Sequence, residues 1–100
     1  MIVRERETPE GLLVSVCDDG LIGETFEDGE VTLEVNESFY QGDRCSDDEV
    51  IEALERAAVA NIVGVRAVTL AIEAGVVDED RVLDIGEVRH AQVLNLARSG

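Results

Sequence analysis

Lysine and tryptophan are absent from this chain of 100 residues, proline occurs once, and only three residues are aromatic. Without lysine the chain lacks the phosphate-binding lysine of a P-loop, which excludes nucleotide hydrolases of that class. With so few aromatic side chains, the core must be built from valine, leucine, isoleucine and alanine, whose side chains carry no polar atoms. The composition therefore predicts a plain aliphatic core.

Long apolar runs are also missing. The longest stretches, at 59–65 and 67–72, are interrupted and fall short of the roughly 20 residues that a membrane-spanning helix requires. The N-terminal segment alternates charge from Arg4 to Glu7 and lacks the apolar region of a secretory signal. We therefore expect a cytoplasmic protein without membrane contact, in which Cys17 and Cys45 are free thiols.

Acidic residues dominate what is present: 23 of them stand against eight arginines, for a net charge of −15. Self-repulsion of this size destabilises a compact state unless salt screens it, so the composition indicates a salt-rich cytoplasm. An acidic protein of an ordinary cell, or an acidic interaction domain, is the alternative. Residues 1–55 have a net charge of −14 and residues 56–100 of −1. This asymmetry marks either an interaction surface or deeper burial of the second half.

The order of hydrophobic patterns predicts one α+β domain over residues 1–100. In this domain, N-terminal hairpins and a C-terminal hairpin form a small mixed or antiparallel sheet, and two helices pack on one face of it. The expected strands are 1–6, 12–17, 25–27, 30–35, 81–85 and 88–96, and the expected helices are about 46–60 and 65–74.

Local signals support several of these elements. Asp28-Gly29 and Gly86-Glu87 are typical of two-residue hairpin turns. Ser46 and Glu49 have the spacing of a capping box at the start of a helix. Residues 61–64 read as a breaker or a short extended segment, and residues 91–97 as a strand or as one or two helical turns.

Catalytic and metal-binding patterns are absent from the sequence. His90 is the only histidine, so any nucleophilic dyad or triad must combine it with Cys17, Cys45 or a serine, and no local pattern supports this. These three residues are also too widely spaced to indicate a zinc site. Asp47 and its acidic neighbours lack the alternating ligands of a calcium loop. We therefore predict no catalytic residues, no metal and no small-molecule cofactor.

A polar segment near the C-terminus is the remaining candidate for function. Its planar or basic side chains suit phosphate, base edges or backbone carbonyls: Arg81, Arg89, His90, Gln92, Asn95 and Arg98. Strand alternation places His90 and Gln92 on one face, and Arg89 with Asn95 on the other. The simpler interpretation is an ordinary strand with satisfied polar ends.

Four motifs resemble an archaeal family known as domain of unknown function 424, over nearly the whole chain. They are residues 14–18 leading to 21–23 and Phe26, residues 39–42, residues 60–64 and residues 86–92. The resemblance implies an archaeal cytoplasmic protein and provides no catalytic residues. It draws attention to Tyr40, Asn61, His90 and Gln92, whose side chains each need hydrogen-bond partners. Arg89 stands where the family is expected to have proline.

From these observations we predict a non-enzymatic binding module for RNA, the ribosome or a translation-associated protein. The candidate contact residues are Tyr40, Asn61, Arg89, His90 and Gln92. Two alternatives remain open. One is a protein–protein or dimerisation module that uses strand edges or the helix at 67–74, and the other is a small enzyme centred on His90 with a cysteine.

Overall fold

The computed structural model describes residues 1–94, and its helices and strands confirm the predicted α+β class. The strands are β1 (Ile2–Thr8), β2 (Gly11–Cys17), β3 (Thr25–Asp28), β4 (Val31–Glu34), β5 (Asp43–Arg44), β6 (Val59–Val63), β7 (Leu83–Ile85) and β8 (Val88–Leu94). The helices are α1 (Glu37–Tyr40), α2 (Asp47–Arg56), α3 (Val65–Glu73) and the 3-10 turn η1 (Glu79–Arg81).

The main sheet has the strand order β5-β1-β2-β6-β8-β7. All neighbouring strands pair antiparallel except β2 and β6, which are parallel, so the sheet is mixed. The prediction of helix for residues 57–60 was wrong, because α2 ends at Arg56 and Val59–Val63 form a central strand. The extended alternative for residues 61–64 agrees with this strand. This segment becomes a strand because it gains hydrogen-bonded partners on both sides, and because Ala60, Ile62 and Val63 become buried.

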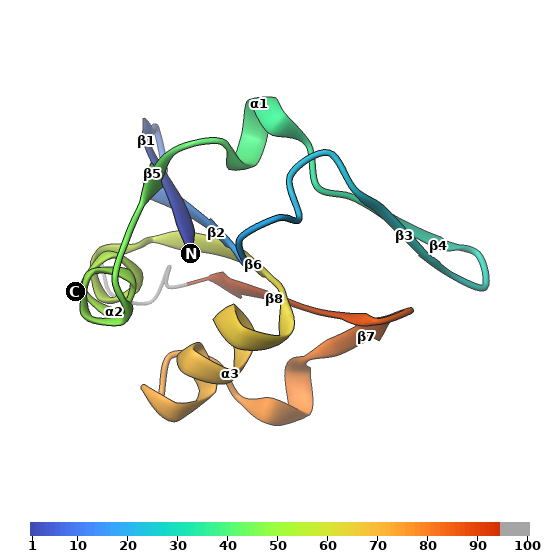
Figure 1. Ribbon diagram of the computed structural model, residues 1–100. Coiled ribbons are helices and arrows are strands. Elements are labelled where there is room, and N and C mark those ends of the chain that lie inside the picture. Colours follow the sequence, from blue (N-terminus) through green and yellow to red (C-terminus); the bar gives the residue numbers. More distant parts are fainter. Residues whose placement is uncertain (95–100) are drawn as a thin grey trace.

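Two layers cover the main sheet (Figure 1). Helices α2 and α3 pack on one side, which we call the helix face, and the aliphatic core lies between them and the strands. The members of this core include Val14, Val16, Val50, Leu54, Ile62, Ala67, Val68 and Ala91. The prediction of two helices on one face of the sheet is therefore confirmed.

The opposite side, which we call the hairpin face, is covered only in part. Helix α1 and the β3–β4 hairpin lie over it, and the hairpin extends away from the body of the molecule (Figure 1). A second, smaller core fills this contact and contains Cys17, Val35, Tyr40, Val63, Ile85 and Val88, with Phe26, Leu33 and Phe39 packed against it. The four-residue helix α1 was not predicted from the sequence.

The three predicted hairpins are present, with one correction. Asp28 pairs with Val31, so the turn of the second hairpin is Gly29-Glu30 rather than Asp28-Gly29, with Gly29 at φ 62°. That hairpin forms its own two-stranded sheet. In the C-terminal hairpin Ile85 pairs with Val88 across the predicted turn. Residues 91–94 are strand, whereas 95–97 lie outside the described residues.

Both main helices begin with side-chain caps. The backbone N–H of Glu49 donates to Ser46 Oγ (3.3 Å), and the Ser46 N–H donates to the Glu49 carboxylate (2.8 Å), which confirms the capping box. This hydrogen bonding lowers the pKa of Glu49. At α3 the cap comes from β2: the N–H groups of Arg66 and Ala67 donate to the Asp18 carboxylate at 3.0 and 2.8 Å. Asp18 therefore joins the end of β2 to the start of α3.

Candidate functional site

Four polar side chains lie side by side across the middle of the hairpin face. The strand register puts Arg4 opposite Ser15, and Asn61 between Ser15 and Gln92. Residues directly opposite one another point to the same face. Because neighbouring strands are about 4.8 Å apart, these four residues span roughly 14 Å. We call this set, Arg4, Ser15, Asn61 and Gln92, the polar row.

Exposure increases along the polar row from Ser15 to Gln92. The Ser15 side chain is buried, Asn61 is half-buried and Gln92 is exposed. Neither carboxamide forms a hydrogen bond with any described residue. Carboxamides have donor and acceptor atoms that are costly to leave unpaired once water is excluded. Asn61 and Gln92 are therefore available to an external ligand.

A second row runs parallel to the first. Arg6, Leu13, Val59 and Leu94 lie opposite one another in that order, and all four are at least partly exposed. Leu94 is 62% exposed. Together with the polar row these residues form what we call the open strip, which lies beside α1 and the hairpin on the hairpin face. Its side chains are at least partly exposed except that of Ser15, which is 2% exposed.

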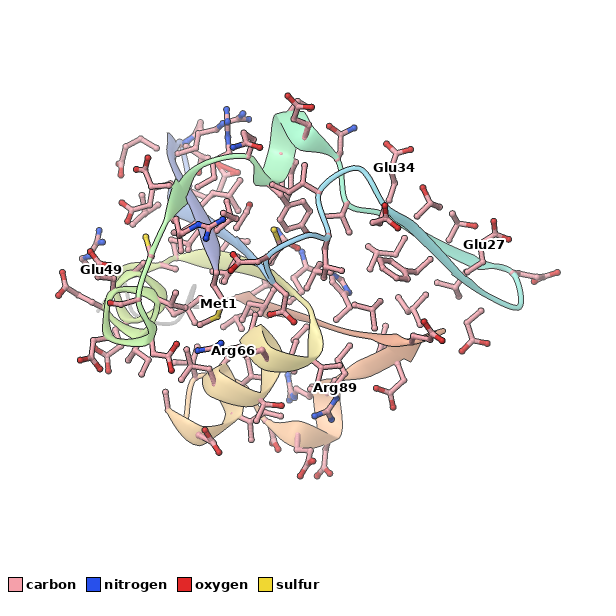
Figure 2. The ribbon with its side chains drawn as sticks, viewed as in Figure 1. Met1, Glu27, Glu34, Glu49, Arg66 and Arg89 are labelled. Carbon is pink, nitrogen blue, oxygen red and sulfur yellow. The ribbon has the colours of Figure 1, made fainter. Side chains whose placement is uncertain are left out.

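No carboxylate belongs to the open strip, although the chain has 23 of them. The acids of β1 alternate with its arginines and point to the helix face, where the Glu5 carboxylate accepts from Arg56 at 2.8 Å. By contrast Glu27 and Glu34 point into solvent along the β3–β4 hairpin (Figure 2). The open strip is a region of positive or neutral side chains on a strongly acidic molecule.

The two arginines of the strip differ in their surroundings. Arg4 is half-buried and donates through one terminal nitrogen to the Gln41 carbonyl oxygen at 3.1 Å. Its Nε is buried and has no hydrogen-bond partner among the described residues. Arg6 is exposed and forms no ion pair within residues 1–94. Guanidinium groups in this condition suit phosphate or carboxylate oxygens.

The structure brings three of the five predicted contact residues together and separates the other two. Asn61, His90 and Gln92 share the hairpin face. Arg89 lies on the helix side of the sheet (Figure 2), where its guanidinium is 3.4 Å from the Asp84 carboxylate and 3.8 Å from that of Glu79. The alternation predicted for residues 89–92 is thus confirmed, and Arg89 is already engaged by two acids.

Tyr40 lies inside the second core. Its side chain is buried and its ring packs edge-on against Phe39, with the centroids 5.1 Å apart. Burial, together with the nearby Cys17 thiol, raises the pKa of Tyr40 to about 12. Tyr40 therefore fastens α1 to the sheet and is not available at the surface.

His90 lies beyond the polar row, where the covered part of the hairpin face begins. It is opposite Val63, which is itself opposite Cys17, so the histidine and this cysteine are two strands apart, roughly 10 Å. Burial lowers the pKa of His90 and raises that of Cys17 to about 11. Cys45 packs against the core of the helix face, and its pKa is also raised by burial. No described hydrogen bond joins His90 to either thiol.

Two surface hollows lie near functional candidates. One of about 280 Å³ lies at the β8 edge of the sheet. Its lining includes Gln92 and Leu94 of the open strip, Val76, Val77 and Val93 of the helix-face core, and the charged residues Asp78 and Arg81. The other, of about 470 Å³, lies at the start of α3. Its charged groups are already paired, because Asp18 caps α3 and Arg66 is 3.1 Å from the Asp47 carboxylate. Only the first hollow extends a surface with unpaired donors.

Residues 1–94 contain neither a cluster of metal ligands nor a membrane-spanning helix. Within this range no group of three or more His, Cys, Asp or Glu side chains is arranged to hold a metal ion. No helix in the described part of the chain is long and apolar enough to cross a membrane.

Comparison with known proteins places this fold in a family. The family model described as "Protein of unknown function (DUF424)" matches residues 5–96. The chain belongs to this family. It is also similar to the crystal structure of an uncharacterized conserved protein from Methanopyrus kandleri, with a TM-score of 0.75 and 25% sequence identity over 92% of this chain and 88% of that one. No curated protein matches the chain.

Two glycines in the motifs that resemble DUF424, Gly42 and Gly64, lie where a side chain would collide with a neighbouring element. Gly64 has φ 120°, and a side chain there would put its Cβ 2.3 Å from the Asp18 carboxyl carbon. At Gly42 an added Cβ would lie 2.0 Å from the carbonyl oxygen of Val3. These positions allow close packing between elements. The family position expected to hold proline is Arg89, and β8 continues through it with its Val88–Leu94 pairing intact.

Sequence reasoning missed two members of the polar row, Arg4 and Ser15, and the whole of the second row, which includes Arg6. The alternating Arg4-Glu5-Arg6-Glu7 contains the signal that separates arginines from acids on opposite faces. Which face meets Asn61 and Gln92, however, depends on the pairing of β2 with β6, which are separated in the sequence by β3, β4 and β5.

Proposed function

We propose that this DUF424 chain is a non-enzymatic module that binds single-stranded RNA through the open strip. The observation that carries the proposal is the absence of carboxylates from this strip on a chain with a net charge of −15. A surface that has no carboxylates and exposes the guanidinium of Arg6 can bind a polyanion.

The types of side chain also support RNA. Proteins that recognise single-stranded RNA use exposed sheet surfaces on which bases lie flat, and they form hydrogen bonds to the base edges. Arginine guanidinium planes can stack on bases, and carboxamides can pair with base edges. The strip has both, with the aliphatic side chains of Leu13 and Val59 beside them. Aromatic stacking platforms are absent from the strip, so we expect modest affinity.

The salt concentration determines how much electrostatic forces contribute to binding between this protein and RNA. In molar salt, charges are screened over about 3 Å, so the long-range repulsion between an acidic protein and RNA is weak. The attraction of phosphate for arginine is weakened as well. Binding must then rest on short-range hydrogen bonds, stacking and close contacts, which is the chemistry of the polar row.

A charge-reversal pair tests the proposal. Photo-crosslinking to mixed-sequence single-stranded RNA in concentrated KCl is compared for the parent chain, Arg6→Glu and Arg66→Glu. Both variants change the net charge equally, but Arg66 lies on α3, on the other side of the sheet. We expect Arg6→Glu to weaken binding about tenfold and Arg66→Glu to change it little. Equal losses in both variants, or no crosslink in the parent chain, would contradict the proposal.

The exposed Leu94 favours a second candidate, a translation-associated protein or a second copy of this chain on the same strip. Leu94, Val59 and Leu13 form a short apolar row. If this candidate is right, crosslinking in native salt recovers a protein partner and no RNA. The Leu94→Glu variant should then no longer crosslink to that protein. The enzyme alternative has no comparable support, since both thiols have raised pKa values and no hydrogen bond within residues 1–94 joins either of them to His90.

A further inference from the structure

We infer that the adjacent carboxamides of Asn61 and Gln92 make the open strip prefer adenine over the other bases. The inference rests on the RNA binding proposed above and specifies the chemistry of the same site. It assigns distinct roles within the strip: the arginines provide affinity for the RNA backbone, and the carboxamide pair provides preference for a base.

The geometry of the pair carries the inference. Asn61 and Gln92 are directly opposite each other on β6 and β8, so their Cβ atoms are about 5 Å apart. Neither side chain is committed to a hydrogen bond with residues 1–94. Two carboxamides at this separation can contact one base from two sides.

The two carboxamides differ in their exposure to water. Along β6, Val59 and Val63 flank Asn61 on the same face, and along β8, His90 and Leu94 flank Gln92. Asn61 is half-buried, whereas Gln92 is exposed in the free protein. A base that covers the pair excludes water from both carboxamides, and a mismatched donor or acceptor then costs more than it does in solvent. Discrimination between bases therefore arises when the base covers the pair.

Hydrogen-bond complementarity selects adenine. Each carboxamide offers one donor and one acceptor. The N6 amino group of adenine has two hydrogens and lies between two acceptors, N1 and N7, so each of its two edges combines a donor with an acceptor. The N7 edge of guanine has two acceptors, which suits an arginine fork rather than a carboxamide. Guanine also has mixed edges, O6 with N1–H and N2–H with N3, but its amino group lies beside one acceptor and one donor, so it cannot give the same donor–acceptor pair to a carboxamide on each side. Cytosine and uracil have only one edge of the mixed kind, so they cannot engage both side chains.

Cationic groups lie at both ends of the pair. Arg4, with its unpartnered Nε, continues the polar row on the β1 side. On the β8 side, the 280 Å³ hollow beside Gln92 is lined by Arg81 together with Asp78. A strand of RNA that crosses the sheet along this row can put phosphates near Arg4 and Arg81 while a base occupies the carboxamide pair.

The test measures base preference separately from affinity. Uridine oligonucleotides that carry a central run of adenine, cytosine or guanine are titrated, by fluorescence anisotropy in concentrated KCl, against the parent chain and three variants. Gln92→Met and Asn61→Leu remove the carboxamides at nearly constant size. Gln41→Met is the matched control, because Gln41 is an exposed glutamine outside the strip whose described hydrogen bonds all come from its backbone.

For the parent chain we expect the adenine oligonucleotide to bind roughly tenfold more tightly than the others. Gln92→Met and Asn61→Leu should each remove most of this preference and leave the affinity for plain oligouridine nearly unchanged. Gln41→Met should behave as the parent chain, and thermal unfolding should confirm that all variants are folded.

The possible failures are distinct. If the parent chain binds all oligonucleotides equally and Arg6→Glu weakens all of them, RNA binding stands and the adenine inference is overturned. The inference also fails if Gln41→Met lowers the preference as much as Gln92→Met does. If no oligonucleotide binds, the proposed function fails and the inference fails with it.

Discussion

The two faces of the main sheet differ in cover, composition and charge. The helix face is sealed by α2 and α3 over an aliphatic core, and carboxylates such as Glu5 lie at its rim, where Arg56 neutralises one of them. The hairpin face is half covered by α1 and the β3–β4 hairpin, and within residues 1–94 the open strip on this face has no acid. In a chain with 23 acids, this local absence is the difference between the two faces on which the proposed RNA binding rests.

Side chains on the two faces are expected to contribute to different properties, those of the helix face to stability and those of the open strip to binding. A side chain on the helix face contributes mainly through burial, whereas one on the open strip is solvated in the free protein and contributes when a ligand covers it. Substitutions on the two faces should therefore affect different measurements. The largest expected effect lies in the sealed core.

Leu54→Ala and Leu94→Ala form the first test of this contrast. Leu54 is 1% exposed between α2 and the sheet, and Leu94 is 62% exposed on the open strip. We expect Leu54→Ala to lower the free energy of unfolding by about 2–5 kcal/mol, because it removes buried atoms and leaves a cavity. Leu94→Ala should change it by less than about 0.5 kcal/mol. Denaturant unfolding in constant KCl measures both, and similar losses at the two sites would mean that the strip is covered.

Gly64→Ala and Gly75→Ala give the next largest effect, at the junction of the sheet with α3. Both glycines have positive φ angles, of 120° and 77°, but only at Gly64 would a new Cβ collide with the Asp18 carboxylate that caps α3. Gly75→Ala should cost about 1–2 kcal/mol from backbone strain alone. Gly64→Ala should cost clearly more, because it also displaces the cap. Equal costs, measured by thermal unfolding, would show that Asp18 relaxes without loss.

The features that sequence reasoning predicted correctly depend on neighbours in the chain. The capping box of Ser46 and Glu49 closes within three residues, and the Gly86-Glu87 turn joins adjacent strands. Alternation along β8 correctly assigned Arg89 to one face of the sheet and His90 and Gln92 to the other, although the strands that pair with β8 were unknown. Such signals are local, so a single sequence contains them.

The features that were missed depend on distant partners. β6 has a polar residue, Asn61, at its centre and begins three residues after a helix, so its sequence resembles a connection until β2 and β8 pair with it. The polar row exists only in that register. Of the two carboxylates beside Arg89, that of Asp84 follows from the local β7–β8 hairpin, in which the two residues are directly opposite. The carboxylate of Glu79 belongs to η1, whose position alternation along β8 does not specify.

His90 gives the smallest effect, at the boundary between the covered and open halves of the hairpin face. Burial lowers its folded-state pKa, while in the unfolded chain its pKa has the ordinary value of about 6.5. As pH falls below about 6.5, the unfolded state therefore binds a proton before the folded state does, and stability is lost until the folded-state pKa is passed. Above that window both states are neutral and the contribution of His90 does not change with pH.

His90→Gln should remove this loss. We expect the parent chain to become less stable than the variant, relative to their difference at neutral pH, as the pH is lowered through the mildly acidic range just below about 6.5. Urea unfolding at a series of pH values in constant KCl measures the two slopes. Because the general carboxylate contribution is common to both proteins, the difference between the slopes isolates the histidine. Parallel slopes would mean that the His90 ring is as well solvated as Gln92, and would extend the open strip by one row.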